Sequence, residues 1–410
     1  MEKRVVITGM GAVTPIGHSV EETWQGIKDG ACGIAEITHF DTTGEKCHMG
    51  AEVKDWVYPD KRAAKRLDVV NQYANIAAKE AMEQSGIVSG ENVDPERFGI
   101  IAASGIGGVK TLEDQIVKAT VKDTTRFVSA LMVPMLIINM VGGNLAIEYQ
   151  AKNSCLGLAT ACASGTHGIG EAYRMIKHGY ADVMIGGGAE APFSKICFAG
   201  FENMTATTVR TDPNRCSTPF DAERDGFVMG EGAGFFVLEE YEHAKARGAK
   251  ILGEIAGYGT TCDAYHITAP EPSGDGAARA MKMALQDAGI APEEIDYINA
   301  HGTGTPLNDL SETRAIKLAF GDDTKVPVSS TKGNIGHLLG AAGSVEAIFC
   351  LKAIEEGWIP PTINLEKPDP ELTLDYVPNE GRKADITYTM SNSLGFGGHN
   401  GTLIIKKFED

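Results

Sequence analysis

The sequence predicts a mixed α/β protein. Strand-like apolar runs alternate with helix-like runs along all 410 residues, a pattern typical of layered α/β architectures. The 49 glycines suit the tight turns between such layers better than they suit a helical bundle. Apolar residues make up 43% of the chain, enough for a large core. A chain of this length forms one large domain or two to three ordinary ones.

Periodicity and flanking turn residues place the individual elements. The expected strands are residues 4–8, 98–102, 156–159, 182–185, 234–238, 251–257, 297–300, 326–329, 387–392 and 401–406. The expected helices are residues 69–85, 166–178, 276–288, 309–320 and 344–356. The first strand leads into a turn at Gly9, so the N-terminus differs from a signal peptide.

A faint internal repeat relates the two halves of the chain. Each half has a strand, a loop of small residues, a helix, a second strand and a glycine-rich loop, over residues 157–188 and 326–398. We therefore divide the chain near residue 250, into a half that spans 1–250 and a half that spans 251–410. This repeat would bring the loops of Cys162 and His337 to related positions around a shared centre.

The net charge of −18 argues against some partners. An acidic surface disfavours nucleic acid and anionic membranes. The nearly uncharged stretch 127–147 contains Pro134, Asn139 and Asn144, and the polar amides among them are costly in lipid. We therefore expect a buried helix or a subunit interface there, and no membrane association.

The sequence offers no cofactor site. No pair of the eight cysteines has C-x-x-C spacing, and no histidine spacing is typical of a metal site. Gly9-Met10-Gly11 lacks the third glycine of a dinucleotide-binding loop, because Thr14 stands there. We expect no cofactor, no metal, and a cytoplasmic protein with reduced thiols.

Cys162 is the first candidate for a catalytic residue. It lies between the expected strand 156–159 and the expected helix 166–178. Most cysteines in such a protein are inert core residues, but a strand-to-helix turn exposes a nucleophile and supplies N–H groups for an oxyanion. The helix dipole and these N–H groups predict an ionised thiolate.

Two histidines stand in small-residue loops after strands. They are His301, in His301-Gly302-Thr303-Gly304-Thr305, and His337, in Lys332-Gly333-Asn334-Ile335-Gly336-His337. Each alone would more often be structural, but one thiol with two histidines indicates acyl-thioester chemistry. The charge of Lys332 would bias nearby groups, with Glu346 as a candidate buried partner.

Two further features are candidates for supporting roles. His266 stands in Asp263-Ala264-Tyr265-His266-Ile267-Thr268, where it could support the site. The loop Gly395-Phe396-Gly397-Gly398 could bring a backbone N–H toward the sulfur of Cys162, with Phe396 as a gate. The alternative is that this loop is a structural turn with no catalytic role.

Together these motifs resemble the β-ketoacyl-acyl-carrier-protein synthases of fatty acid synthesis, in particular the elongating type II enzymes. The resemblance spans the chain and rests on residues 5–11, 160–165, 224–234, 301–306, 330–343 and 392–401. Cys162, His301 and His337 resemble the Cys-His-His set of the elongating branch. The initiating branch has Cys-His-Asn, and Asn334 does not occupy the position of His337.

The resemblance implies a thiolase-like fold of two similar halves in five layers, α-β-α-β-α, and an obligate homodimer. It also implies a two-stage reaction. Cys162 accepts an acyl chain from acyl carrier protein, and malonyl carrier protein then loses CO2 and attacks the acyl-enzyme. The two histidines would stabilise the enolate, while the N–H groups of Cys162 and Phe396 hold the tetrahedral oxyanion and Lys332 gives electrostatic support.

The resemblance also implies binding residues. Thr303 and Thr305 correspond to a pair that hydrogen-bonds pantetheine, with Thr268 nearby. Ile106 and Phe201 correspond to residues of the acyl pocket. The basic cluster at Lys61, Arg62, Lys65 and Arg66 corresponds to a docking face for an acidic carrier, although such a run is more often only a solvated helix face.

This chain departs from the family pattern at three places. Ser129-Ala130-Leu131-Met132 stands where Ser-Pro-Phe-Phe is usual, which gives the acyl pocket a more pliable wall. Leu394 replaces a phenylalanine of the gating loop. Thr218 replaces an arginine that helps to bind the carrier, with Arg210, Arg215 or Arg126 as candidate substitutes.

Three alternative functions share parts of this pattern. A polyketide-type ketosynthase has the same catalytic set and is the closest alternative. A coenzyme A thiolase needs a second catalytic cysteine near the C-terminus, and residues 391–401 contain none. A non-catalytic chain-length subunit lacks the nucleophilic cysteine, which is present here.

Overall fold

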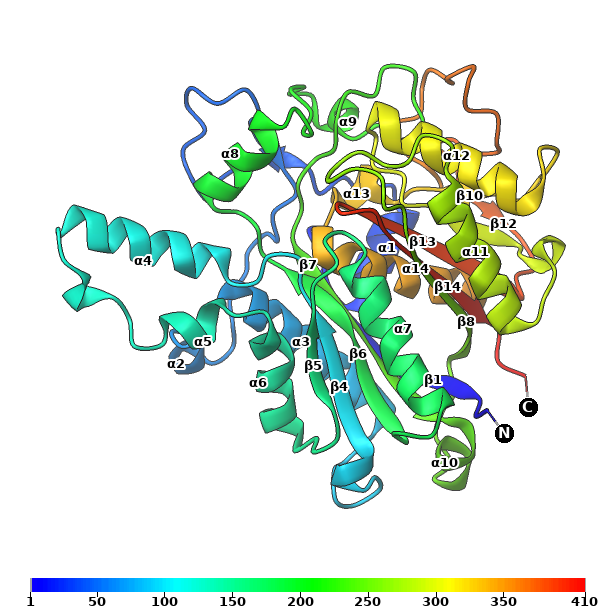
Figure 1. Ribbon diagram of the computed structural model, residues 1–410, viewed down its shortest axis with the longest axis horizontal. Helices are drawn as coiled ribbons and strands as arrows, with labels where there is room; N and C mark the ends of the chain where they lie inside the picture. Colours follow the sequence, from blue (N-terminus) through cyan, green and yellow to red (C-terminus); the bar gives the residue numbers. More distant parts are fainter. Residues whose placement is uncertain (1, 410) are drawn as a thin grey trace.

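The computed structural model describes residues 2–409, and its central feature is one twisted sheet of ten strands (Figure 1). The strand order across the sheet is β10-β9-β13-β14-β8-β1-β7-β6-β4-β5. The bounds of these strands are β1 Val5–Val13, β4 Phe98–Ala103, β5 Cys155–Leu158, β6 Val183–Glu190, β7 Gly232–Glu240, β8 Gly253–Cys262, β9 Tyr297–Asn299, β10 Val328–Ser329, β13 Tyr388–Gly395 and β14 His399–Lys406. Two short pairs lie apart from it, β2 Ala35–Glu36 with β3 Met49–Gly50 and β11 Trp358–Ile359 with β12 Arg382–Lys383.

Each half of this sheet has the same topology. In the first half β5, β4 and β6 are parallel, and β7 and β1 continue the sheet antiparallel. In the second half β10, β9 and β13 are parallel, and β14 and β8 continue antiparallel. The strand order along the chain is the same in both, and the halves join where residues 5–7 of β1 pair with residues 253–255 of β8. The faint sequence repeat thus corresponds to a duplicated arrangement of strands.

Helices complete the five layers. The helices are α1 Val20–Lys28, α2 Lys61–Ala64, α3 Val69–Ser85, α4 Val109–Val121, α5 Met132–Leu136, α6 Asn139–Tyr149, α7 Ser164–Lys177, α8 Lys195–Asn203, α9 Pro213–Cys216, α10 Tyr241–Ala246, α11 Asp275–Ala288, α12 Pro306–Phe320, α13 Lys332–Ile335 and α14 Ala342–Glu356. Helices α7 and α14 contact each other and strands of both half-sheets, whereas α3 packs on β1 and β7 and α11 packs on β8 and β14. The order α3, half-sheet, α7 with α14, half-sheet, α11 confirms the predicted thiolase-like five-layer fold.

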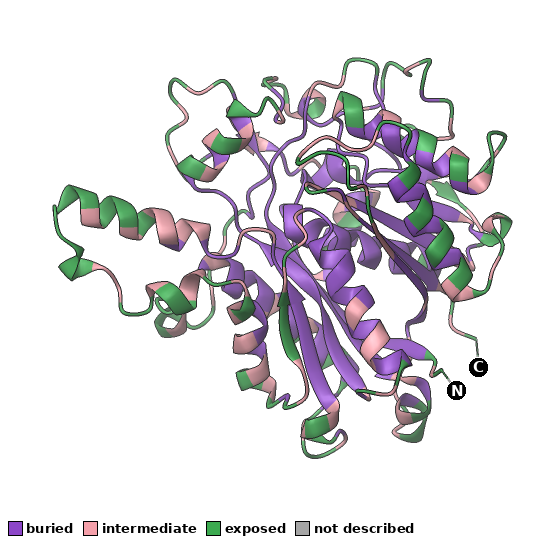
Figure 2. Ribbon diagram, viewed as in Figure 1, coloured by how far each residue is buried: buried purple, intermediate pink, exposed green. Residues whose placement is uncertain are grey.

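Burial follows from the sequence of each helix. Apart from Glu346 and Lys352, residues 342–354 of helix α14 are apolar or small, and all of them are buried (Figure 2). Helix α11 buries only one face, on which small residues and Met281 meet the sheet. A helix that is apolar all round belongs inside a protein, and an amphipathic helix belongs on its surface. Composition alone therefore separates the central layer from an outer one.

Strand β1 is longer than the sequence indicated. The expected strand ended at Thr8, but β1 continues to Val13. A Cβ atom on Gly9 would lie 2.0 Å from the carbonyl oxygen of Ala81 in α3. The glycines of this strand therefore allow helix and strand to approach closely, and the expected turn at Gly9 is wrong.

The apolar stretch 127–147 forms short helices at one side of the molecule. Helix α4 projects from the body, and α5 and α6 return the chain to the sheet (Figure 1). Several apolar side chains of this arm are exposed, among them Val117, Val121 and Val133 (Figure 2). None of the helices within residues 2–409 is long and apolar enough to cross a membrane.

Candidate active site

A cavity of about 300 Å³ opens among the loops that follow the strands of both halves. Cys162, His301, His337 and Phe396 all line it. Cys162 lies just beyond β5, His301 just beyond β9, and Phe396 just beyond β13. The carboxyl ends of parallel strands meet at one edge of a sheet, and the duplication brings two such edges together. The structure therefore gathers the predicted thiol and both predicted histidines in one pocket.

The backbone at Cys162 forms a tight turn between β5 and α7. Ala161 has a φ of +49°, in the left-handed region that alanine rarely adopts. The backbone N–H groups of Cys162 and Phe396 both approach the sulfur of Cys162. A Cβ atom on Gly395 would lie 2.7 Å from the Thr160 carbonyl oxygen and 3.2 Å from the Cys162 nitrogen, so only glycine lets these two loops meet.

Cys162 is protonated in the resting pocket. Burial raises the pKa of this thiol to about 12, and the charge of Glu190 adds to the effect. The positive charge of Lys332 and the two nearby N–H groups lower the pKa, but by less than burial raises it. The pKa therefore contradicts the expectation of a thiolate at rest, because burial of the sulfur outweighs the groups that favour the charged form.

The two imidazoles are neutral. Their ring centroids are 5.1 Å apart, with the planes at 82°. Burial and then the charge of Lys332 hold the pKa of both His301 and His337 well below the ordinary value of 6.5. Among residues 2–409, neither imidazole ring forms a hydrogen bond. Each ring therefore has a free N–H group to offer to a ligand, as the chemistry predicted from the sequence requires.

Lys332 and Glu346 form an ion pair beneath the pocket. Both side chains are fully buried, and the Lys332 ammonium contacts one carboxylate oxygen of Glu346. Burial raises the pKa of the Glu346 carboxyl to about 7, against the opposing effect of Lys332. A buried pair of this kind fixes a positive charge in place and leaves little freedom for either side chain. The sequence-based prediction of Glu346 as the buried partner of Lys332 is confirmed.

Sequence reasoning missed two carboxylates on α12 that hold the His301 loop. Glu312 accepts hydrogen bonds from the backbone N–H groups of His301 and Gly302, each at 2.8 Å. Asp309 accepts one from the N–H of Gly304 at 3.2 Å. Both carboxylates are fully buried, and burial raises the pKa of the Glu312 carboxyl to about 7. The available signal was two acidic residues three apart on a helix that directly follows the histidine motif.

The predicted binding residues divide into two groups. Thr303, Thr305 and Thr268 line the cavity, and the hydroxyl oxygens of Thr303 and Thr305 are 3.0 Å apart. Phe201 also lines it, with its ring centroid 6.3 Å from that of Phe396. Ile106 instead packs against the apolar cluster that contains Cys162. The three threonines and Phe201 thus face this opening, and Ile106 lies against its apolar floor.

His266 is exposed and does not reach the cavity. Its Nδ1 accepts hydrogen bonds from the backbone N–H groups of Thr268 and Ala269, at 3.1 and 3.0 Å. Leu394, which replaces a family phenylalanine, does line the cavity. His266 therefore supports the turn that presents Thr268, as a residue behind the site.

The predicted docking cluster is solvent-exposed. Lys61, Arg62, Lys65 and Arg66 all lie at the surface, on or just after α2. Thr218 is instead 1% exposed, so it lies beneath the surface, where it cannot contact a carrier. The carrier contact made by an arginine at this position in the family is therefore missing here.

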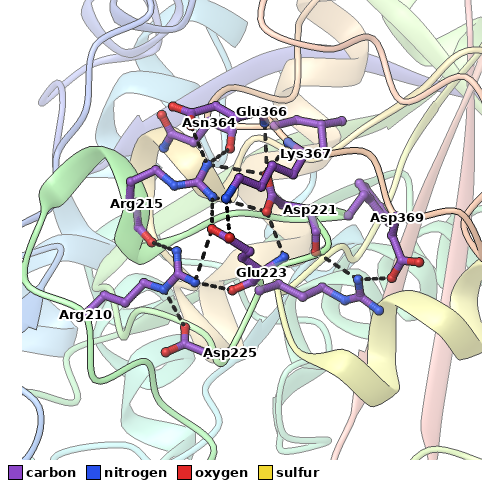
Figure 3. Close-up of polar contacts among 12 residues, drawn as sticks. Arg210, Arg215, Asp221, Glu223, Asp225, Asn364, Glu366, Lys367 and Asp369 are labelled. Carbon is purple, nitrogen blue, oxygen red and sulfur yellow. Dashed lines mark hydrogen bonds and ion pairs between the residues drawn. The ribbon is translucent and has the colours of Figure 1, made fainter.

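Two of the proposed substitute arginines are already engaged (Figure 3). Arg215 pairs with Asp221 at 3.2 Å and with Glu223 at 3.5 Å, and Arg210 pairs with Asp225 at 3.7 Å. Further hydrogen bonds, made by Arg215, Asp221 and Arg224, tie the loop beside the cavity to residues 364–369. Arg126 is exposed and has no ion pair within residues 2–409, so it is the remaining candidate of the three.

No group of three metal-binding side chains occurs within the described part of the chain.

The site consists of a buried thiol on a strand-to-helix turn, two neutral imidazoles, the lysine of a buried ion pair and converging N–H groups. This is the arrangement of a thiolase-fold condensing enzyme.

The comparisons with known proteins identify the family. The family models described as the N-terminal and C-terminal domains of beta-ketoacyl synthase match residues 2–244 and 252–366. The chain belongs to the beta-ketoacyl synthase family. It is 49% identical to 3-oxoacyl-acyl-carrier-protein synthase 2 of Synechocystis sp. (strain ATCC 27184 / PCC 6803 / Kazusa), covering 100% of this chain and 99% of the relative.

Further relatives agree. The enzyme of the same name from Staphylococcus aureus (strain COL) is 50% identical, over 99% of both chains. Among solved structures, a ketosynthase bound to a hexaketide and in complex with a type II polyketide acyl carrier protein superimposes with a TM-score of 0.93. Its sequence is 33% identical, with 100% of both chains covered.

Proposed function

We propose that this enzyme elongates acyl chains by decarboxylative condensation. An acyl chain on Cys162 reacts with malonyl-acyl carrier protein and gives β-ketoacyl-acyl carrier protein and CO2. The observation that carries this proposal is the meeting of one thiol and two neutral imidazoles in a single cavity. The relatives at about half identity are named 3-oxoacyl-acyl-carrier-protein synthase 2, which supports this reaction, and we assign it to fatty acid synthesis.

In the first stage, the Cys162 sulfur attacks the thioester carbon of the acyl carrier. A C–S bond forms, and the N–H groups of Cys162 and Phe396 stabilise the tetrahedral oxyanion. The bond to the carrier sulfur then breaks, and the proton from the Cys162 thiol passes to the departing thiolate. Because the resting thiol is protonated, the proton that the leaving group needs is already in the site.

In the second stage, malonyl carrier protein enters and its thioester oxygen accepts hydrogen bonds from His301 and His337. The bond between the malonyl C2 and its carboxylate breaks, CO2 departs, and the electron pair forms an enolate. Neutral imidazoles suit this role because each can donate an N–H to the oxygen as its charge grows. The enolate carbon attacks the acyl thioester, and the Cys162 sulfur leaves and takes up a proton.

Substrate binding follows the same geometry. The paired hydroxyls of Thr303 and Thr305, with Thr268 across the opening, provide hydrogen bonds for the amides of a pantetheine arm. Phe201 and Ile106 contribute apolar surface for the acyl chain. Lys332 supports both stages as a fixed positive charge.

The carrier is acidic in this proposal and docks on the exposed basic cluster at residues 61–66. The solved relative in complex with its acyl carrier protein supports a carrier as partner.

A homodimer is the proposed assembly. Strand β5 is an edge of the sheet, and three of its four residues are exposed, including Leu156. An exposed apolar edge strand invites pairing with a second copy. The α4–α5 arm beside it adds exposed apolar residues, namely Ile116, Val117, Val121, Phe127, Leu131 and Val133.

We also propose that the chain divides near residue 250, and that the enzyme acts in the cytoplasm.

One experiment tests the proposed function directly. Incubation with an acyl carrier protein should add the mass of the acyl group to the intact protein, and Cys162→Ala should prevent it. A wild-type enzyme that accepts no acyl chain from any carrier would contradict the proposal. Acylation by polyketone chains in preference to saturated chains would favour a polyketide-type ketosynthase. Cleavage of acetoacetyl-coenzyme A would favour a thiolase.

A further inference from the structure

Glu190 is a buried charge that the condensation mechanism leaves without a role. It ends β6, and its side chain is fully inaccessible to solvent. The Ser104 hydroxyl donates to it at 2.9 Å, and the N–H groups of Gly105, Ile106 and Gly340 donate at 2.7, 3.1 and 2.9 Å. The carboxylate therefore joins the loop after β4 to a turn in the other half of the chain.

The hydrogen bonds favour the ionised form of this carboxylate. Three of its four partners are backbone N–H groups, which can only donate. Among the four partners, only the Ser104 hydroxyl could accept a proton from a neutral Glu190. That hydroxyl already accepts the N–H of Gly107 at 3.0 Å. Burial raises the pKa of Glu190, and these hydrogen bonds oppose that rise.

Glu190 lies near the turn that carries the nucleophile. A Cβ atom built on Gly105 would be 2.6 Å from a Glu190 oxygen and 3.6 Å from the carbonyl oxygen of Ala161. Gly105 therefore separates the carboxylate from the turn that carries Cys162. Its other neighbour, Ile106, packs in the same apolar cluster as Cys162. A single carboxylate therefore holds the wall of the proposed acyl pocket, and the Gly105 backbone that it binds lies beside the turn that supports the thiol.

We propose that Glu190 is a positioning residue of the condensation, which holds the backbone of Gly105 and Ile106 beside the cysteine turn and places a fixed negative charge near the Cys162 thiol. The charged groups that face Cys162 are Glu190 and Lys332, with His301 and His337 as neutral neighbours. Glu190 opposes the effect of Lys332 on the thiol. A protonated resting thiol resists adventitious electrophiles and retains the proton that the leaving carrier sulfur takes.

Alkylation of Cys162 by iodoacetamide tests the electrostatic part without any carrier. The rate at a given pH follows the thiolate fraction, so Glu190→Gln should alkylate roughly tenfold faster than wild type between pH 7 and 9. Peptide mass spectrometry assigns the modified cysteine. A rate within twofold of wild type, in a folded variant, overturns the proposal.

Glu202→Gln is the matched control. Glu202 is also buried, and it accepts backbone N–H groups from Lys46 and Cys47, both at 3.0 Å. It is not among the main groups that shift the pKa of Cys162. This variant also perturbs buried hydrogen bonds to a carboxylate, two where Glu190 has four, and it should leave the alkylation rate of Cys162 unchanged. An equal acceleration in both variants would show a general loosening of the fold and would overturn the proposal.

Ser104→Ala tests whether Glu190 positions the pocket wall, and this variant remains as the test if Glu190→Gln does not fold. This variant removes one hydrogen bond to Glu190 and one from Gly107 but keeps the charge. The ratio of acylation rates for long and short acyl carriers should change by about threefold or more, while the alkylation rate stays near that of wild type. An unchanged ratio overturns the proposal. This arm rests on the proposed function, and a wild type that is never acylated would refute that function instead.

Discussion

At Cys162, burial outweighs every favourable charge in the site. Lys332 and two N–H groups stabilise a thiolate, yet the pKa of the thiol rises to about 12. The same burial keeps His301 and His337 neutral, since it disfavours any isolated charge. Lys332 forms its ion pair with Glu346 in the same buried setting. The protonation states of Cys162, His301 and His337 thus follow from burial in one pocket.

The histidines should separate the two stages of the reaction. His301→Ala and His337→Ala should each lower decarboxylation of malonyl carrier protein by about 100-fold or more, because each removes one hydrogen bond to the enolate oxygen. Acylation of Cys162 should fall much less. CO2 release and intact mass measure the two stages separately. His266→Ala changes an exposed histidine and serves as the control, and an equal loss of both stages in the pocket variants would contradict the assigned roles.

The free energy of unfolding should decrease as the pH drops below 6.5, because of His301 and His337. Their pKa is lower in the folded state than the 6.5 of an unfolded chain, so the unfolded state binds more protons below pH 6.5. Each neutral histidine then costs up to about 1.4 kcal/mol of stability per pH unit. His337→Gln should therefore lose about 1 kcal/mol less than wild type between pH 6.5 and 5.5 in urea titrations. An identical loss in both proteins would show that His337 takes up a proton in the fold.

At the scale of elements, the loops after the strands form the site and helices hold them. Glu312 on α12 fixes the backbone of the His301 loop, and the loop after β13 packs on the cysteine turn through Gly395. Both contacts hold the loops rigidly, because each involves backbone atoms at hydrogen-bond or van der Waals distance. Catalytic geometry in this enzyme is therefore a property of loop-to-loop contacts.

Gly395→Ala should displace the Phe396 loop. The added methyl group would meet the Thr160 carbonyl oxygen at 2.7 Å, so the loop must move away from Cys162. Acylation of Cys162 should slow by about tenfold or more, since one oxyanion donor is misplaced. Gly200→Ala is the control, because nothing lies within 4 Å of its added methyl group. Normal acylation by the Gly395 variant would show that the Phe396 N–H is dispensable.

Local sequence patterns predicted the helices and strands well, but they predicted the long-range contacts that hold the site poorly. The bounds of α3, Val69–Ser85, agree with the sequence because Asp68 caps its start and Gly86 its end. Strand β1 was underestimated, since the packing of Gly9 on α3 has no local signature. Cys162, His301 and His337 could be found from motifs, but the ionisation of Cys162 could not, because burial depends on the whole fold.

At the scale of the molecule, duplication explains why one pocket can hold two kinds of chemistry. One half supplies the thiol and its turn, and the other supplies both histidines and Lys332. Within residues 2–409 the half-sheets join through three residue pairs between β1 and β8, and the central helices α7 and α14 make most of the contact between halves. Glu190 bridges the halves as well, through the N–H of Gly340.

The outer edge of the first half-sheet should be the contact between two copies. Leu156 on β5 is 49% exposed at an edge with unpaired backbone groups. Leu156→Asp places a charge in that contact, and sedimentation should change from twice the 43.5 kDa chain mass to the chain mass itself. Leu318→Asp is the control, because Leu318 is 50% exposed on α12, away from this edge. A wild type that sediments as a single chain would contradict the proposed dimer, and a variant that stays dimeric would place the contact elsewhere on the surface.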